Sequence, residues 1–167
     1  MRRIEVPVLV VGGGPVGMMT GLLLDRVGLG SLTVERRDGP QRAPAAHVVS
    51  ARTFEICRQA GLDMAEILAA AKDPKDSGHV NFVTRLAGDL IGRLPFERQG
   101  DECYAHTPTP LRNLSQHRFE PILSSAFESR EHASLQYKLQ WESSEQDDDG
   151  VRSVLRNLAT DEMVEVH

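Results

Sequence analysis

A short glycine-rich segment and one carboxylate carry the clearest chemistry in the sequence. The segment from Gly12 to Gly17 has the spacing GxGxxG and follows the apolar run Val8 to Val11 directly. Glu35 follows at the distance of roughly 20 residues at which an acidic residue accompanies this motif. Such a turn lets backbone N–H groups and the positive end of the next helix approach a diphosphate, while the carboxylate accepts hydrogen bonds from ribose hydroxyls. The combination predicts a dinucleotide site.

Each position in the segment has a predicted task. Gly12 permits the tight turn, Gly14 lets the backbone approach a pyrophosphate, and Gly17 lets the helix pack closely on the strand. Pro15 and Val16 begin that helix, and we include both with the three glycines among the cofactor-binding candidates. The acidic residue further on disfavours a 2′-phosphate, which favours FAD or NAD over NADP. The alternative is a strand-to-helix turn that binds no ligand.

The elements that position these residues form a βαβ unit. Residues 8–11 are apolar and mostly β-branched, which is typical of a parallel strand buried on both faces. Apolar residues then recur at helical spacing from Val16 to Val27, and Gly28 supplies the stop. Residues 32–35 have the pattern of a second short strand. Parallel strands need a crossover helix of this kind.

The pattern changes further along the chain. We expect an exposed loop over 36–50, helices over 51–60 and 64–71, a hairpin with strands at 80–84 and 90–94, a long connection over 99–113, and a helix from Ser115 through Phe127. Strict alternation over 135–141, a turn at 147–150 and apolar runs over 151–158 and 163–166 predict a β-meander. The predicted fold is α/β, a Rossmann-like βαβ fold with an added β-meander and a partial hairpin.

Charge and hydropathy narrow the class of protein. The 167 residues hold 19 Lys and Arg against 24 Asp and Glu, for a formal net charge of −5. Because binding to nucleic acid rests on basic side chains that neutralise phosphates, we expect no nucleic-acid partner. No apolar run approaches the roughly 18 residues of a membrane span, so we expect no membrane partner either.

The cysteines and the N-terminal residues indicate in which cellular compartment the protein is located. Cys57 and Cys103 lie far apart and outside any metal-binding spacing, which indicates no metal site and is compatible with a reducing cytoplasm. Glu5 and Pro7 interrupt the apolar residues near the N-terminus. We therefore expect no secretory leader and a cytoplasmic location.

Four segments resemble one known family. They are VLVVGGGPVG at 8–17, VER at 34–36, AHVVSARTFEICRQAGL at 46–62 and LSQHRFEPIL at 114–123, with a weaker match in TRLAGDLIGRLPF at 84–96. Together they resemble the FAD-dependent aromatic hydroxylases, which are single-component flavoprotein monooxygenases of the phenol hydroxylase and para-hydroxybenzoate hydroxylase type.

The resemblance implies that FAD binds in an extended form with the glycines at its pyrophosphate. Glu35 would then lie on the adenosine ribose, with Arg36 beside it. Gln116 matches a family position near the ribityl and phosphate region of the flavin. Arg52 either supports the same site or pairs with Glu55 on the surface of its helix.

The resemblance also implies a reaction and a place in a larger protein. In the family, NADPH or NADH reduces the flavin, which then uses O₂ to hydroxylate a small aromatic substrate. The cofactor carries that chemistry, so we expect no catalytic side chain in this chain. The family has a second flavin motif, GDGxxS or close to it, after the meander. We expect residues 1–167 to be the N-terminal part of the FAD-binding domain, an incomplete fragment of the enzyme, with 78–112 as the beginning of an interleaved substrate-side segment.

Three alternatives stay open. A squalene-epoxidase-like or geranylgeranyl-reductase-like flavoprotein shares the first motif but not the ARTFE and SQ segments. A non-catalytic flavin-binding module is favoured by the lack of a second flavin motif. An NAD-binding dehydrogenase domain shares the features of the first 35 residues, although the loop over 36–50 and the hairpin do not suit a regular six-strand sheet.

Overall fold

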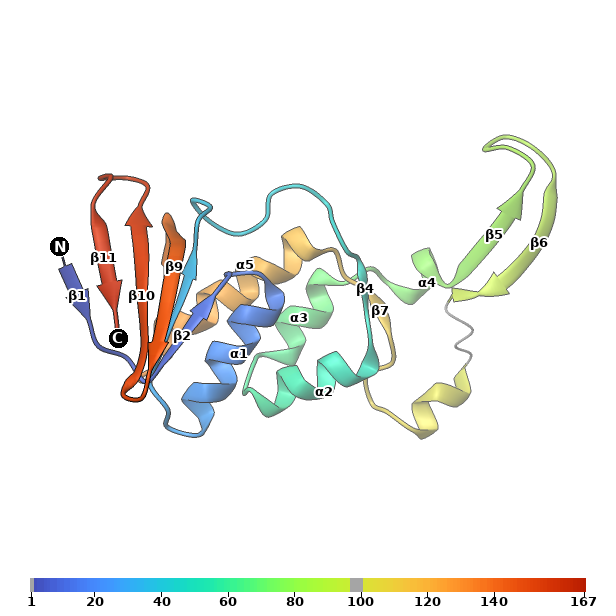
Figure 1. The fold of residues 1–167 in the computed structure, drawn as a ribbon. Helices are drawn as coiled ribbons and strands as arrows, with labels where there is room; N and C mark the ends of the chain where they lie inside the picture. The colour runs from blue at the N-terminus through green and yellow to red at the C-terminus, as the bar shows by residue number, and fades with distance from the viewer. Residues whose placement is uncertain (1, 97–100) are drawn as a thin grey trace. The chain divides into compact units, whose positions relative to one another are not determined.

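The computed structural model describes residues 2–96 and 101–167 (Figure 1). The chain divides into two compact units, one formed by residues 1–43 with 119–167 and the other by residues 44–118. Among the described residues, every helix is too short or too polar to cross a lipid bilayer.

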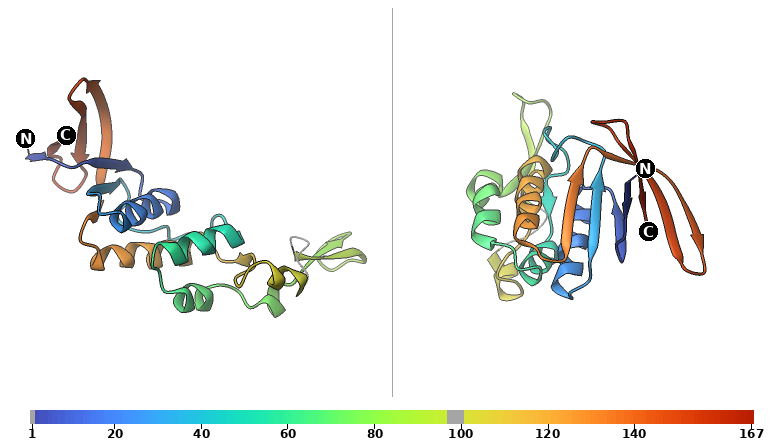
Figure 2. Two further views of the ribbon diagram at one scale, coloured as in Figure 1. Left: turned by 90° about the horizontal axis from the view of Figure 1, so that it is seen from below. Right: turned by 90° about the vertical axis from the view of Figure 1, so that its left-hand side faces the viewer.

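Three parallel strands form the centre of the first unit. β2 (Val8–Val11), β3 (Ser31–Glu35) and β8 (Ala133–Tyr137) pair in the order β2-β3-β8, and α1 (Pro15–Arg26) connects β2 to β3. The helix packs on β3 and β8, along one face of the sheet (Figure 2). Every residue of β3 is buried, as expected for a central parallel strand. The predicted βαβ unit is confirmed.

A second sheet packs against the other face of β3. It contains β1 (Arg2–Ile4), β9 (Leu139–Asp147), β10 (Gly150–Asn157) and β11 (Met163–Val166) in the order β1-β11-β10-β9. The last three strands are the predicted antiparallel meander, and β1 pairs parallel to β11. The two sheets share one apolar core, formed by Leu32, Val34, Leu139, Leu155, Val164 and Val166.

The prediction of one strand over 135–141 was wrong. Lys138 has a φ of 60° and separates β8, in the parallel sheet, from β9, in the meander. Its N–H donates to the Arg37 carbonyl over 2.9 Å, and its carbonyl accepts from the Leu158 N–H over 2.7 Å. Side-chain alternation continues across this residue, and alternation alone does not reveal which neighbour a backbone pairs with.

The predicted helix after Ser115 is also present. α5 (Gln116–Ala126) contains Pro121 and is followed by the short η3 (Phe127–Ser129). The part of α5 from Phe119 onward belongs to the first unit.

Among its described residues, the second unit contains three α-helices that lie wholly within it and two small antiparallel pairs. α2 (Ala51–Gln59) and α3 (Met64–Ala70) match their predicted ranges closely, and α4 (Pro74–Ser77) was not predicted. Ser50 and Asp63 cap the first two helices by accepting N–H groups of their first turns. Both helices contribute fully buried side chains to the interior of the unit, namely Phe54, Cys57 and Ile67.

The predicted hairpin is formed by β5 (His79–Val83) and β6 (Leu90–Pro95). The expected connection over 99–113 starts with two residues, 99 and 100, that lie outside the described ones. Its remainder contains η2 (Asp101–Ala105) and β7 (Arg112–Asn113). β7 pairs with β4 (Val48–Val49), a strand in the expected loop over 36–50. These two-residue strands are too short to leave a recognisable pattern.

Candidate functional site

The turn between β2 and α1 has the backbone geometry that the glycine spacing predicts. Gly12 has a φ of 111°, which residues with a side chain rarely adopt, and its N–H donates to the Val34 carbonyl over 2.8 Å. Gly14 is the N-cap of α1, and Pro15 occupies the first helical position. Val16 follows with 82% of its surface exposed. The first turn of α1 therefore begins directly after β2. The prediction that this strand is buried on both faces was wrong, since its residues are only partly buried and Val11 is 55% exposed.

The glycines at 14 and 17 have opposite surroundings. A Cβ on Gly17 would lie 1.9 Å from the Gly12 carbonyl oxygen, so a side chain here would force the helix away from the turn. A Cβ on Gly14 would have no heavy atom within 4 Å. Gly17 is thus required by the packing of the protein itself. Gly14 borders open space, which is where the motif expects a ligand.

Glu35 ends β3 as a buried carboxylate. Its Oε2 accepts the Gly13 N–H over 2.9 Å, and its Oε1 accepts the Arg37 N–H over the same distance. Burial by itself would raise the pKa of Glu35, but the hydrogen bonds from Arg37 and Gly13, together with the charge of Arg37, outweigh it and leave the pKa below its ordinary value. Glu35 is therefore an anion in a fixed orientation near neutral pH.

The importance of Gly13 was missed, because the motif leaves this position free. A Cβ on Gly13 would lie 2.7 Å from the Cβ of Glu35. The close approach that this allows is what brings the Gly13 N–H to the carboxylate. The turn and the carboxylate are consequently parts of one structure.

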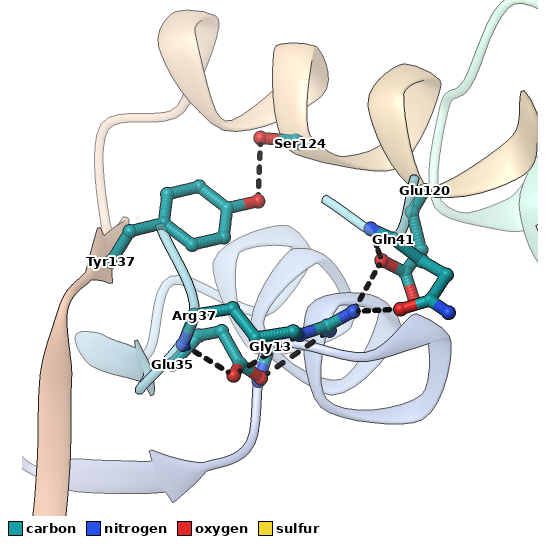
Figure 3. A network of polar contacts seen from close by, with 7 residues as sticks. All are labelled: Gly13, Glu35, Arg37, Gln41, Glu120, Ser124 and Tyr137. Atoms are coloured by element: carbon teal, nitrogen blue, oxygen red, sulfur yellow. Dashed lines mark hydrogen bonds and ion pairs between the residues drawn. The ribbon is translucent and has the colours of Figure 1, made fainter. Parts of the chain in front are cut away.

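A second buried carboxylate, on α5, joins the same group of side chains (Figure 3). The guanidinium of Arg37 lies 3.2 Å from Glu35 by its Nε and 3.4 Å from Glu120 by its Nη1. It also donates to the side-chain oxygen of Gln41 over 2.8 Å, and the Gln41 N–H donates to Glu120. We call Glu35, Arg37, Gln41 and Glu120 the carboxylate network. The hydrogen bond between the Arg37 guanidinium and Glu35 is the largest cause of the raised pKa of Arg37.

Neither Arg37 nor Glu120 was among the predicted site residues. The two lie 83 positions apart in the sequence, so no local pattern joins them. A signal for Glu120 does exist, because it shares helical spacing with Leu123 and Phe127, both buried. A carboxylate on the apolar stripe of a helix needs a partner in the interior.

A hollow of about 310 Å³ opens beside Glu35. Its walls include Gly12, Arg36 and, from the start of β9, Gln140 and Trp141. The Trp141 indole N–H donates to the Ser144 hydroxyl over 2.7 Å, which limits how the ring can turn. The hollow thus combines a glycine turn, a fixed anion, a cation and an aromatic ring in one place.

The other two candidates, Arg52 and Gln116, belong to the second unit. Arg52 forms the ion pair with Glu55 that the sequence left as one alternative, with 3.1 Å between nitrogen and oxygen. Gln116 is the first residue of α5, and its N–H donates to the Ala46 carbonyl over 2.8 Å. No group of three or more His, Cys, Asp or Glu side chains among the described residues could hold a metal ion.

A βαβ unit with a glycine turn and an acidic residue at the end of its second strand defines the class of dinucleotide-binding folds. Within that class, a model of the family described as "FAD binding domain" matches residues 5–167. The chain belongs to this family, which confirms both the resemblance found in the sequence and the predicted fold class.

Similar proteins and structures carry consistent names. The chain is 32% identical to a 2,4-dichlorophenol 6-monooxygenase of Delftia acidovorans, over 98% of this chain and 28% of that protein. It is 36% identical to the protein of the same name from Cupriavidus pinatubonensis, over 92% of this chain and 26% of that one. The flavin-dependent monooxygenase PieE, in complex with FAD and substrate, superimposes with a TM-score of 0.89 at 32% identity, over 99% of this chain and 29% of that one. The chain therefore spans less than a third of the length of each.

Proposed function

We propose that the chain is the FAD-binding portion of a flavin-dependent monooxygenase that hydroxylates a phenol-like aromatic compound. The observation that carries the proposal is the hollow beside Glu35, which lies next to the glycine turn in a chain of the FAD binding domain family. The names of the similar proteins support the class of reaction and of substrate.

The residues of the first unit fit the adenosine diphosphate half of FAD. The open space at Gly14 leaves room for the pyrophosphate beside the start of α1, where N–H groups without intrahelical partners favour an anion. Pro15, Val16 and Gly17 form the remainder of that first turn. Each carboxylate oxygen of Glu35 accepts a backbone N–H and also lies against the Arg37 guanidinium, so the proposed ribose hydroxyls would share this carboxylate with Arg37. Arg36 lines the same hollow.

The bound flavin would supply electron transfer and the reaction with O₂, while this chain binds and orients it. NADPH or NADH is the proposed electron donor. Gln116 and Arg52 are proposed to support the flavin-side part of the cofactor, and the ion pair of Arg52 with Glu55 makes a purely structural role for Arg52 equally consistent. We propose no catalytic residue in this chain.

The proposed domain assignment gives residues 1–167 to the FAD-binding domain, with 78–112 as the beginning of a substrate-side segment. The hairpin in that segment supports it, since its apolar side chains, such as Phe82 and Ile91, are exposed. A cytoplasmic location is supported by Cys57 and Cys103, which are both free thiols.

FAD binding is the direct test. The purified chain is titrated with FAD, followed by the absorbance of the flavin and by calorimetry. We expect saturable binding that Gly14→Val weakens at least tenfold, or about 1.4 kcal/mol, because the side chain would occupy the space at the pyrophosphate. Glu35→Ala removes the ribose acceptor and should have an effect of similar size. Gly92→Val, at a position with no heavy atom within 4 Å of the added Cβ, is the matched control and should bind FAD normally.

Trp141 provides an independent readout, because it is the only tryptophan in the sequence. ADP-ribose does not absorb the emission of tryptophan, so quenching by ADP-ribose reports contact of its base with the ring rather than energy transfer. We expect ADP-ribose to quench Trp141 and riboflavin, which lacks the adenosine half, to leave it unchanged at low concentration. A folded chain that binds NAD⁺ but not FAD would instead assign the site to the dehydrogenase class.

A further inference from the structure

Glu120 is a buried anion that the proposed binding of FAD does not use. Its side chain is 0% exposed. One of its oxygens accepts the Gln41 N–H and lies 3.4 Å from the Arg37 guanidinium. Burying a carboxylate is costly unless it is paired and hydrogen-bonded, and both conditions are met within the first unit. The charge of Glu120 is therefore held in a fixed position, where it acts on the neighbouring side chains of the carboxylate network.

The nearest affected group is the guanidinium of Arg37, which two carboxylates share. Its Nε and Nη2 face Glu35, and its Nη1 faces Glu120 and the side chain of Gln41. One cation and two anions leave the carboxylate network with a formal charge of −1. Each of the three guanidinium nitrogens of Arg37 already faces a carboxylate, so another anion would have to compete with Glu35 and Glu120 for them.

This arrangement bears on which ribose the site accepts. An arginine near the acidic residue at the end of the second strand is the usual means of accommodating a 2′-phosphate, and Arg37 contacts that acidic residue directly. Phosphate is also a good bidentate partner for a guanidinium. Arg37 would therefore be a suitable phosphate ligand if Glu120 did not hold it.

We propose that Glu120 is a specificity-determining residue that acts through Arg37, holding the guanidinium on the two carboxylates so that the ribose site rejects a 2′-phosphorylated nucleotide. The proposal rests on the proposed adenosine site, and Glu120 itself does not touch the ligand. Its functional consequence is that NADPH, which shares its adenosine diphosphate half with FAD, is kept out of the flavin site by its extra phosphate.

A matched pair of ligands tests the proposal. ADP-ribose and 2′-phospho-ADP-ribose differ only in the 2′-phosphate, and calorimetry at pH 8 gives the ratio of their dissociation constants. We expect the unsubstituted chain to prefer ADP-ribose by about tenfold or more, since like charges in contact are strongly unfavourable. Glu120→Gln keeps an oxygen for the Gln41 N–H and removes the charge, and it should reduce that preference by about fivefold or more.

Two further variants give the test its controls. Asp38→Asn removes one negative charge from an exposed ion pair with Arg42 in the same loop, and its ratio should stay within about twofold of the original. Arg37→Gln removes the shared cation and should change the ratio in the opposite direction, to a stronger rejection of the 2′-phosphate. Circular dichroism verifies that each variant is folded. If Glu120→Gln does not fold, the ratio of dissociation constants in Arg37→Gln decides whether the carboxylate network sets the specificity.

The outcomes separate the two proposals. A ratio that stays constant in Glu120→Gln and Arg37→Gln, even if both ligands bind more weakly, overturns the specificity role and leaves Glu120 as a structural residue. FAD binding measured on the same samples tests the site itself. If the unsubstituted chain binds neither FAD nor ADP-ribose, the adenosine site is refuted and this inference with it.

Discussion

The turn between β2 and α1 and the β5–β6 hairpin are both short regions that contain glycine, but their side chains have opposite surroundings. In the turn, a Cβ added to Gly13 or Gly17 would meet other atoms of the first unit, and Glu35 beside them is buried and paired. In the hairpin, every residue of β5 is exposed, and Leu86 near its tip is fully exposed.

This difference indicates where substitutions should leave the stability of the fold unaffected. The backbone of the hairpin is held by its own ladder of hydrogen bonds, and the described residues give its side chains almost no burial to lose. The turn has the reverse property at two of its glycines, since an added methyl group would meet backbone at Gly17 and the Glu35 side chain at Gly13. Substitutions at Gly13 and Gly17 should therefore have large effects, and substitutions of exposed side chains in the hairpin small ones.

The largest effect is expected for Gly17→Ala. Its Cβ would lie 1.9 Å from the Gly12 oxygen, so α1 must move, and we expect a loss of about 3 kcal/mol in the free energy of unfolding. Gly14→Ala adds the same methyl group to open space in the same turn and should change it by less than about 0.5 kcal/mol. Urea unfolding followed by Trp141 fluorescence measures both. Equal midpoints for the two variants would contradict the contrast.

A smaller effect is expected from the charge of Glu35. Because its pKa is lower in the folded protein than the ordinary 4.5, the charged form stabilises the fold at pH values above 4.5. That contribution should decrease as the pH falls from 4.5 through the lower pKa of the folded state. Glu35→Gln should be less stable than the original chain by about 1–2 kcal/mol at pH 7, and the difference should disappear in acid.

The control for this prediction is Asp38→Asn, at an exposed ion pair in the same loop. Its stability should follow that of the original chain over the whole pH range. Thermal unfolding at a series of pH values makes the comparison. A difference between Glu35→Gln and the original chain that persists unchanged below pH 4 would show that the charge is not the cause.

Within the second unit, the two thiols extend the comparison from the turn and hairpin to the helices. Cys57 is fully buried on α2, and burial raises its pKa to about 11, which leaves roughly one thiolate in a thousand at pH 8. Cys103, in η2, is partly exposed. A chromogenic disulfide reagent at pH 8 should therefore modify Cys103 in the native protein and Cys57 only after unfolding. Modification of both at similar rates would show that the helices of this unit open readily.

The smallest effect is expected at the tip of the hairpin. Leu86→Ser replaces a fully exposed apolar side chain and should change the free energy of unfolding by less than about 0.5 kcal/mol. Urea unfolding followed by circular dichroism measures it. A loss of more than about 2 kcal/mol would mean that the side chain is buried in solution, and the contrast between the two regions would then fail.

Local patterns predicted most of the elements and part of the site. The βαβ unit, the helices over 51–59 and 64–70, the hairpin and the last three strands each carry a period or a stop signal within a few residues. Gly17 is likewise recognisable because its reason, the contact of helix and strand, lies within the motif itself. These features depend on neighbours in the sequence.

The features that were missed depend on residues far apart in the chain. Arg37 and Glu120 meet only because α5 packs in the same unit as β3, and the pairing of β4 with β7 joins segments of two residues each. The break at Lys138 depends on a positive φ, and lysine is not a residue type from which a positive φ is predicted. No single stretch of sequence contains the information for any of these contacts.

Lys138 lies at the junction of the two sheets that line the hollow beside Glu35. This single residue transfers the chain from the parallel sheet to the meander, and its backbone is tied to the segment after β3 on one side and to the end of β10 on the other. The hollow has one wall from each sheet, since Glu35 ends β3 and Trp141 lies near the start of β9. Lys138 lines neither wall, yet its left-handed backbone lies at the junction through which the chain passes from one wall to the other.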